Sequence, residues 1–600
     1  MKMIRRLLQE LKQYKRASLL CPVFTALEVL LEVLIPFVTA IIIDRGIEEG
    51  NMTNIYIYGG IMLVMAFFSL VCGALAGRFA AQASSGFACN LREAVYEAVQ
   101  AFSFSNIDKF STAGLVTRMT TDITNVQNAY QMVIRIAVRA PLMLICSMCM
   151  CFLISRKLSL IFLVAIVILA SLLLLIMTRT TRIFKEVFRR YDDLNASVQE
   201  NVSAIRVVKA FVREEYENEK FRQAARKLYS LFVKAEGILA CNSPVMMFVI
   251  YGSILSLSWF GARMIVWGEL TTGELTSMFS YVMGVLMSLM MLSMIFVMVT
   301  MSVASAQRVA EVLEEQPDMK EPDIPAGKLE NGSIRFEHVS FSYKHGSKEA
   351  TLTDIDLDIR SGETIGIIGG TGSGKSTLVN LISRLYDVDR GSVYVGGRNV
   401  KEYDTEVLRD QVAVVLQKNV LFSGTILDNL RWGKEDATEA ECEEVCRQAC
   451  ADEFIRRFPE GYHTWIEQGG TNVSGGQKQR LCIARALLKK PKILILDDST
   501  SAVDTATDAK IREAFANKIP GTTKLIIAQR ISSVQGADRI LVMENGRVDG
   551  FDTHENLLKG NRIYQEIYEA QTQGGGDFDE HTEENAKDAK TGTGKEGARE

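Results

Sequence analysis

The stretch ETIGIIGGTGSGKSTLVNLI, residues 363–382, decides the fold of the second half of the chain. A glycine-rich segment follows the strand-like run TIGII and precedes the helix-like run STLVNLI, which is the context of a phosphate-binding loop. Glycines let backbone N–H groups wrap a phosphate, and the N-terminus of the following helix points at the anion. Lys375 is expected to reach the β- and γ-phosphates of a nucleotide, and Ser376 to ligate Mg²⁺. The expected phosphate-binding residues are Gly369, Gly370, Thr371, Gly372, Ser373, Gly374, Lys375, Ser376 and Thr377.

An acidic pair ends a second apolar run farther along the chain. KILILDD, residues 492–498, reads as a buried strand that stops at Asp497 and Asp498. An aspartate that ends a strand in a chain with such a phosphate-binding loop is expected to hold Mg²⁺ directly or through water. Asp497 is therefore the second predicted Mg²⁺ ligand after Ser376.

A second anion-directed helix start lies between these two motifs. In NVSGGQKQRLCIARALL, residues 472–488, Ser474 is a plausible N-cap, and the two glycines allow close backbone approach to an anion. The predicted anion-binding residues of this segment are Ser474, Gly475, Gly476 and Gln477. One nucleotide does not need two such helix starts, so this one is expected to serve a nucleotide on another subunit.

The first half of the chain predicts a membrane domain. An apolar helix needs roughly 20 residues to cross a bilayer, and stretches of that length lie at 17–43, 55–83, 132–154, 158–177, 239–267 and 274–303. The long connector 178–236 holds 13 Lys and Arg, whereas the loop 44–54 holds one, Arg45. The positive-inside rule therefore predicts that both termini lie in the cytosol. Helical periodicity continues into the long connectors, so the helices are expected to extend beyond the membrane, with coupling helices near 106–118 and 210–221.

Net charge and the two ends of the chain restrict the class of partner. The net charge of −4 argues against a nucleic-acid partner. Residues 1–16 carry six basic side chains, one acid and helically spaced apolar residues, which predicts a helix lying on the membrane surface. Residues 571–600 are glycine-rich and polar, and are expected to be disordered.

Polar and adaptable residues inside the spans leave two interpretations open. Glu28 and Glu32 are four residues apart and share a helix face, so they could attract a cationic substrate or form a structural hydrogen-bonded pair. Eight methionines between Met278 and Met301 could line an adaptable pocket, or could be ordinary helix core.

These motifs together resemble those of an ABC exporter half-transporter: an all-α domain of six transmembrane helices followed by an α/β P-loop nucleotide-binding domain. The resemblance implies that ATP and Mg²⁺ bind, that Tyr343 stacks on adenine, and that Gln417 senses both Mg²⁺ and the attacking water. It identifies Val473 to Gln477 as the signature motif and 501–504 as the loop that crosses between two nucleotide domains. Two halves of this family close two ATP molecules between them, each held by the phosphate loop of one half and the signature of the other.

Two positions depart from the family pattern. Asp498 stands where the family has its catalytic glutamate, and Gln529 where it has the switch histidine. An aspartate is one methylene shorter, and a carboxylate set back by about an ångström could slow hydrolysis on the order of 10²-fold. Glutamine donates a hydrogen bond but carries no positive charge. The predicted catalytic set is Asp498, Gln529 and Gln417, in a pocket expected to bind ATP and hydrolyse it poorly.

The sequence thus predicts the degenerate-site half of a heterodimeric exporter of hydrophobic or amphipathic compounds, such as drugs or lipids. The expected location is a bacterial plasma membrane. Two alternatives remain open: a homodimeric exporter in which Asp498 is a slow base, and an ATP-gated membrane regulator that does not pump. The expected domains are the surface helix 1–16, the membrane domain 17–315, the nucleotide-binding domain 330–570 and the tail 571–600.

Overall fold

The computed structural model describes residues 2–343, 350–498 and 505–573. The chain divides into two compact units. One comprises Met1–Ala101 and Phe110–Glu315, and the other comprises Phe102–Lys109 and Gln316–Glu600. The short segment 102–109 thus belongs with the second unit, although the chain on both of its sides belongs to the first.

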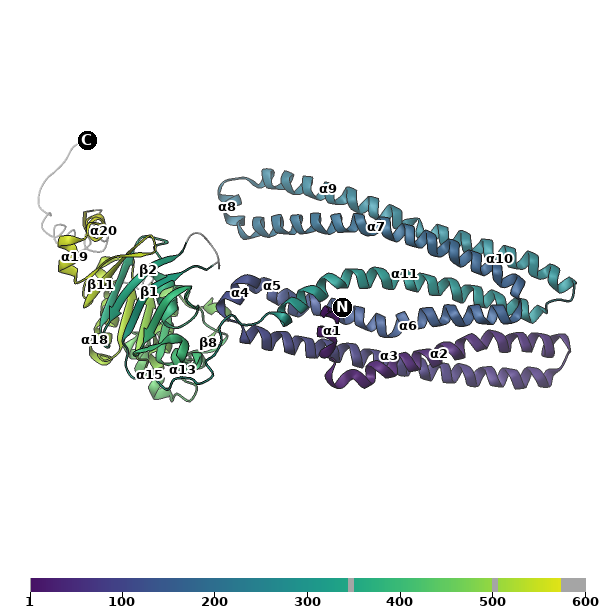
Figure 1. Cartoon of the computed structure of the whole chain (residues 1–600), viewed down its shortest axis with the longest axis horizontal. Coiled ribbons are helices and arrows are strands. Elements are labelled where there is room, and N and C mark those ends of the chain that lie inside the picture. Colours follow the sequence, from purple (N-terminus) through teal and green to yellow (C-terminus); the bar gives the residue numbers. More distant parts are fainter. Residues whose placement is uncertain (1, 344–349, 499–504, 574–600) are drawn as a thin grey trace, which may run out of the picture. The chain divides into compact units, whose positions relative to one another are not determined.

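The first unit is helical throughout its regular structure (Figure 1). Its α-helices are α1 (Lys2–Gln9), α2 (Lys15–Ile42), α3 (Met52–Ala101), α5 (Thr112–Thr117), α6 (Ile123–Ile154), α7 (Arg156–Ser203), α8 (Ile205–Ala210), α9 (Glu214–Ala240), α10 (Asn242–Val266) and α11 (Thr272–Glu314). α4 (Phe104–Phe110) begins in the segment that belongs to the second unit.

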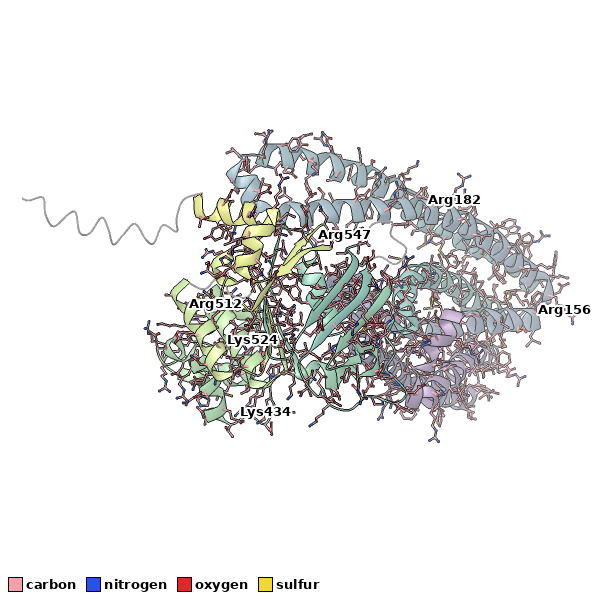
Figure 2. All side chains as sticks on the ribbon, turned by 60° about the vertical axis from the view of Figure 1, so that its left-hand side comes forward. Arg156, Arg182, Lys434, Arg512, Lys524 and Arg547 are labelled. Atoms are coloured by element: carbon pink, nitrogen blue, oxygen red, sulfur yellow. The ribbon has the colours of Figure 1, made fainter. Side chains whose placement is uncertain are left out.

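Six helical segments of the described residues are long and apolar enough to cross a membrane. They are Lys12–Glu48, Met52–Ala101, Thr112–Ile154, Arg156–Ser203, Glu214–Val266 and Thr272–Glu314. This confirms the predicted six-helix membrane domain. The segments run past the predicted spans because the connectors keep their helical periodicity, and Figure 2 shows one polar residue of such an extension, Arg182, projecting from α7.

The short helices between these segments differ in part from the predicted coupling helices. α4 and α5 fall within or beside the expected 106–118. The second short helix, α8, occupies 205–210, ahead of the expected 210–221, most of which belongs to α9. Within the unit, α7 runs beside α9 and α10, and α6 packs along α11 (Figure 1).

The second unit is an α/β domain with two main sheets. Its strands are β1 (Ile334–Phe341), β2 (Leu352–Ile359), β3 (Thr364–Gly369), β4 (Arg390–Val395), β5 (Arg398–Asn399), β6 (Val412–Val415), β7 (Gly424–Thr425), β8 (Trp465–Ile466), β9 (Ile493–Asp497), β10 (Thr523–Ile527), β11 (Arg539–Glu544) and β12 (Arg547–Asp552). Its α-helices after α4 are α12 (Lys375–Ile382), α13 (Thr405–Gln411), α14 (Ile426–Arg431), α15 (Glu439–Gln448), α16 (Asp452–Ile455), α17 (Gly475–Leu488), α18 (Thr505–Lys518), α19 (His554–Gly560) and α20 (Arg562–Gln573). This confirms the predicted α/β fold of the second half.

The larger sheet has the strand order β12-β11-β3-β10-β9-β6, and its neighbours from β11 to β6 are parallel. An antiparallel sheet in the order β2-β1-β4-β5 packs against one face. Alternate residues of β9 point to opposite faces, so Ile493 and Ile495 join the core under α12, whereas Leu494 and Leu496 join the core under α17. The two helices that carry the predicted anion-binding motifs therefore cover opposite faces of one sheet.

Candidate nucleotide-binding site

The phosphate-binding loop connects β3 to α12 at the carboxyl end of a central strand, which is where open α/β sheets bind ligands. Two glycines of the loop are required by its geometry. A Cβ on Gly369 would lie 2.2 Å from the Met543 carbonyl oxygen, and Gly374 has a φ of +93° at the start of α12. Glycine at these two positions therefore allows the loop to adopt this conformation, which a side chain would obstruct or strain.

Lys375 lies over the loop that it is expected to serve. Its ammonium donates to the carbonyl oxygens of Gly369 and Gly370, both at 2.8 Å. Burial lowers the pKa of Lys375, and the nearby carboxylates of Asp497 and Asp498 oppose that shift. The cation is thus held at the loop by neutral carbonyl groups that a phosphate can replace.

Asp497 and Ser376 meet across 121 residues of chain. β9 ends at Asp497, and its Oδ1 accepts a hydrogen bond from the Ser376 hydroxyl at 3.1 Å. Burial raises the pKa of Asp497, and the charge of Asp498 adds to the rise. Two oxygen ligands of the kind that Mg²⁺ prefers therefore lie together beside the phosphate-binding loop.

Asp498 occupies a strained position immediately after β9. Its φ is +47°, in the left-handed region, and its backbone N–H donates to the Ile527 carbonyl at 3.0 Å. The side-chain amide of Gln529 donates to Asp498 Oδ2 at 2.8 Å, and Gln417 also hydrogen-bonds this carboxylate. Burial raises the pKa of Asp498, while these two amides and Lys375 oppose the rise. The structure thus brings all three residues of the predicted catalytic set together.

Tyr343 lies at the edge of the same loop. Its hydroxyl is 3.1 Å from the hydroxyl of Thr377, and its ring is 46% exposed. Phe341 and Tyr386 meet the ring edge to face, with centroids 5.0 Å and 5.1 Å away. A partly exposed aromatic ring, packed against two other rings beside a phosphate-binding loop, offers a surface on which a base can stack.

The SGGQ segment begins α17, as the sequence predicted. Ser474 is the N-cap, and its hydroxyl accepts from the Gln477 N–H at 3.3 Å while the Gln477 side chain accepts from the Ser474 N–H at 2.9 Å. This capping box satisfies the Gln477 N–H and leaves the N–H groups of Gly475 and Gly476 without an acceptor inside the helix. Because α12 and α17 cover opposite faces of the sheet, this helix start belongs to a different surface from the phosphate-binding loop. The predicted loop at 501–504 lies outside the described residues.

Tyr386 is a residue that the sequence reasoning missed. Its ring contacts Phe341 and Tyr343 on one side and Phe104 of α4 on the other, and its hydroxyl donates to Asp108 at 2.8 Å. Ser105 and Asn106 add hydrogen bonds to the segment at 316–318. The segment 102–109 is therefore joined through one tyrosine to the ring at the edge of the nucleotide loop. An aromatic residue in the run SRLYDVD after α12 was the available signal.

Gln571 is a second residue that the sequence reasoning missed. Its amide donates to the Gln529 carbonyl at 2.8 Å and accepts from the Ile531 N–H at 2.9 Å. The expected disordered tail, 571–600, begins inside α20, which runs to residue 573, and the remainder of that range lies outside the described residues. The end of α20 therefore supports the backbone that presents Gln529 to Asp498.

In the membrane unit, the two spanning glutamates share one arginine. Arg139 of α6 donates to Glu28 Oε1 at 2.5 Å and to Glu32 Oε2 at 2.7 Å. A charge in the membrane is costly unless it is paired, and this guanidinium supports a structural role, but it neutralises only one of the two carboxylates. The structural and the substrate interpretations of these glutamates both stay predictions. Several methionines of the predicted cluster are exposed, among them Met291 and Met294, whereas Met278 is buried.

Comparisons with known proteins agree with this architecture. Residues 18–290 match the family model described as the ABC transporter transmembrane region, and residues 352–501 match the model described as ABC transporter. An uncharacterized ABC transporter ATP-binding protein of Bacillus subtilis, YfiB, is 37% identical over 94% of this chain and 97% of its own length. An ATP-dependent lipid A-core flippase of Syntrophus aciditrophicus is 32% identical over 80% of each chain.

A solved structure shows the same fold. The ATP-bound structure of a bacterial Atm1-family ABC exporter superimposes with a TM-score of 0.79 at 22% identity, covering 95% of this chain and 99% of that one. The chain therefore belongs to the ABC transporters, as an exporter half-transporter that carries its transmembrane and ATP-binding domains on one chain, dimerises with a second half, and couples ATP hydrolysis to transport.

Proposed function

We propose that this chain is the degenerate-site half of a heterodimeric exporter. Its own pocket holds ATP and hydrolyses it slowly, and its signature segment completes the hydrolytic site of the partner half. The observation that carries the proposal is the hydrogen bond between the Gln529 amide and the Asp498 carboxylate, at 2.8 Å.

The carboxylate of Asp498 is poorly suited to act as a general base in this setting. A base must reach the attacking water within hydrogen-bonding distance, but Asp498 is one methylene shorter than glutamate and already accepts bonds from Gln529 and Gln417. Burial raises the pKa of Asp498 despite these amides, so its weakness as a base comes from its reach and its occupied carboxylate, not from its pKa. A water molecule would have to displace at least one amide before Asp498 could orient it.

The identity of Gln529 also supports slow hydrolysis in this pocket. A glutamine carries no positive charge, so it stabilises the charge that develops on a transferring phosphate less well than a cation does. Its side-chain amide is also already engaged, because it donates a hydrogen bond to Asp498. Gln529 is held in place by Gln571 through its backbone carbonyl, which favours keeping this arrangement.

The remaining residues support nucleotide holding. Tyr343 offers its partly exposed ring to adenine, and Lys375 with the loop residues 369–377 surrounds the phosphates. Ser376, Asp497 and Gln417 would hold Mg²⁺, which neutralises phosphate charge when bound. The 3.1 Å contact between Ser376 and Asp497 supports this assignment because it places two oxygen ligands at one point.

The intact signature segment supports the role toward the partner. α17 begins with a complete capping box at Ser474 and with N–H groups that have no acceptor inside the helix, and it covers the opposite face of the sheet from α12. A phosphate of the partner's ATP would accept hydrogen bonds from those N–H groups. ATP held in this chain's pocket then acts as a lasting clamp between the halves, while turnover at the partner's site drives the transport cycle.

The proposed cargo is a hydrophobic or amphipathic compound, and the proposed location is a bacterial plasma membrane with both termini in the cytosol. Six long apolar helices and the basic connectors support a membrane location and this orientation. The named relatives are bacterial, and one of them is called a lipid A-core flippase, which favours amphipathic cargo.

The test is the ATPase activity of this chain alone and with its partner half, each reconstituted in lipid. The informative variants are Asp498→Ala and Gly475→Asp. Asp498→Ala removes the candidate base of this pocket. Gly475→Asp places a carboxylate in the first turn of α17, where it favours the helix but repels the partner's ATP phosphate.

The proposal expects little activity from this chain alone, activity in the pair that survives Asp498→Ala, and loss of that activity in Gly475→Asp. Restoring the family residues with Asp498→Glu and Gln529→His is expected to add hydrolysis at this pocket. Strong activity of this chain alone that Asp498→Ala abolishes would make Asp498 a working base, and the heterodimer proposal would be wrong.

A further inference from the structure

The membrane unit contains a cavity of about 530 Å³ between α6 and α11. Asn128, Gln131 and Arg135 line it from α6, and Met291 and Met298 line it from α11. The α6 residues are three and four positions apart, so they lie on one helix face. Met132 and Ile136 of α6 also line the cavity, so its α6 wall combines polar, basic and apolar side chains, whereas its α11 wall is apolar.

The acidic side chains near this cavity do not belong to its lining. Arg139, which lines the cavity, is engaged by Glu28 at 2.5 Å and by Glu32 at 2.7 Å. Both carboxylates belong to α2, and neither lines the cavity. One guanidinium neutralises only one of the two carboxylates, so these three residues together carry a net charge of −1.

Arg135 adds a second positive charge to the lining. It forms no ion pair or hydrogen bond with any residue in the part of the chain that the structure describes, and it is half-buried. Gly77 of α3 makes room for it, since a Cβ there would lie 3.4 Å from Arg135 Nη1. Among the described residues, the lining of the cavity therefore holds two cations, Arg135 and Arg139, and no acidic side chain, which favours an anionic ligand.

We propose that this cavity binds an amphiphile with an anionic head group. Arg135 pairs with the head group, the Asn128 and Gln131 amides donate to its remaining oxygens, and the methionines of α11 contact the apolar part. Methionine suits this role because its flexible side chain adapts to alkyl chains of different shape. The inference rests on the proposed function, because it names the chemical class of the amphipathic cargo.

The test measures equilibrium binding of radiolabelled dodecyl phosphate to the full-length chain in phosphatidylcholine nanodiscs. Dodecyltrimethylammonium serves as the cationic probe with the same alkyl chain. The variants are Arg135→Gln, Arg135→Lys and Arg263→Gln. Arg263 is a matched control, because it lies on α10 in the same unit, stacks on Trp267 and does not line the cavity.

The expected result is that Arg135→Gln weakens dodecyl phosphate binding about tenfold or more, as loss of a charge-assisted contact does. Arg135→Lys, which retains the charge and reports on folding, is expected to keep most of the affinity, and Arg263→Gln all of it. The cationic probe is expected to bind weakly and to be insensitive to Arg135→Gln.

Two outcomes would overturn the inference. One is preferential binding of the cationic probe, and the other is dodecyl phosphate binding that Arg135→Gln leaves unchanged. If both probes stimulate the ATPase of the paired halves equally, only the anionic class is wrong and amphiphile export stands. If neither probe binds the chain or stimulates the pair, the proposed amphipathic cargo fails together with this inference.

Discussion

Tyr386→Phe is predicted to loosen the segment 102–109 while leaving the nucleotide-binding domain folded. The change removes only the hydroxyl, which donates to Asp108 at 2.8 Å. A hydrogen bond to a charged group contributes about 1.5–3 kcal/mol when it is shielded from water. Asp108 is exposed, so we expect about 1 kcal/mol, which corresponds to roughly a fivefold change in the opening equilibrium of the segment.

A second substitution tests the aromatic contacts of Tyr386 separately from its hydroxyl. Phenylalanine at 386 keeps the contacts with Phe104, Phe341 and Tyr343, whose centroids lie at 6.0, 5.6 and 5.1 Å. Tyr386→Leu removes these contacts, each of which contributes about 0.5–1.5 kcal/mol. Only the contact with Phe104 joins the segment, so the leucine variant is expected to open the segment roughly two- to thirteenfold more than the phenylalanine variant, and to disturb the position of Tyr343.

Hydrogen exchange of the full-length chain in nanodiscs measures the prediction directly, because amide protection in 102–109 reports its local opening. The matched control is Tyr462→Phe, which removes the same kind of bond, to Asp452 at 2.8 Å, elsewhere in the domain. Unchanged exchange in 102–109 after Tyr386→Phe would refute the reasoning. Equal loss of protection in the Tyr462→Phe control would refute it as well, since the effect would then be global.

Three further predictions concern the nucleotide-binding domain. Arg384→Met should lower the free energy of unfolding by roughly 3 kcal/mol, because it removes a buried guanidinium that donates to Asp387 and to the carbonyl oxygens of Tyr403 and Lys320; a denaturant midpoint close to that of the unchanged chain would contradict this. Gln571→Ala should raise hydrogen exchange around Gln529 about thirtyfold, through loss of two hydrogen bonds of about 1 kcal/mol each, and ATP affinity should stay the same. The hydrogen bond from the Thr438 backbone holds the pKa of Glu441 at about 2, below its ordinary 4.5, so the stability it contributes is complete above pH 4.5 and is lost as the pH falls toward 2. Unfolding measured across that pH range should show a shallower acid slope in Glu441→Gln.

The nucleotide-binding loop and the membrane domain were predictable because each depends on local sequence. A glycine-rich loop needs its strand, its positive φ angles and its helix within the 20 residues of 363–382. A spanning helix needs only a long enough run of apolar side chains. The start of α17 was predictable for the same reason, because its capping box is complete within four residues, Ser474 to Gln477.

Tertiary structure alone decided which polar groups meet. Gln529 reaches Asp498 across 31 residues of chain, and Arg139 reaches Glu28 across 111. The sequence left the two glutamates open to a substrate or a structural role, and only the packed helices show that both contact Arg139. Tyr386 reaches Asp108 across 278 residues, which assigns the segment 102–109 to the second unit. Hydrogen bonds and ion pairs act only over a few ångströms, so separations of this size become contacts only once the sheet and the helices have been packed.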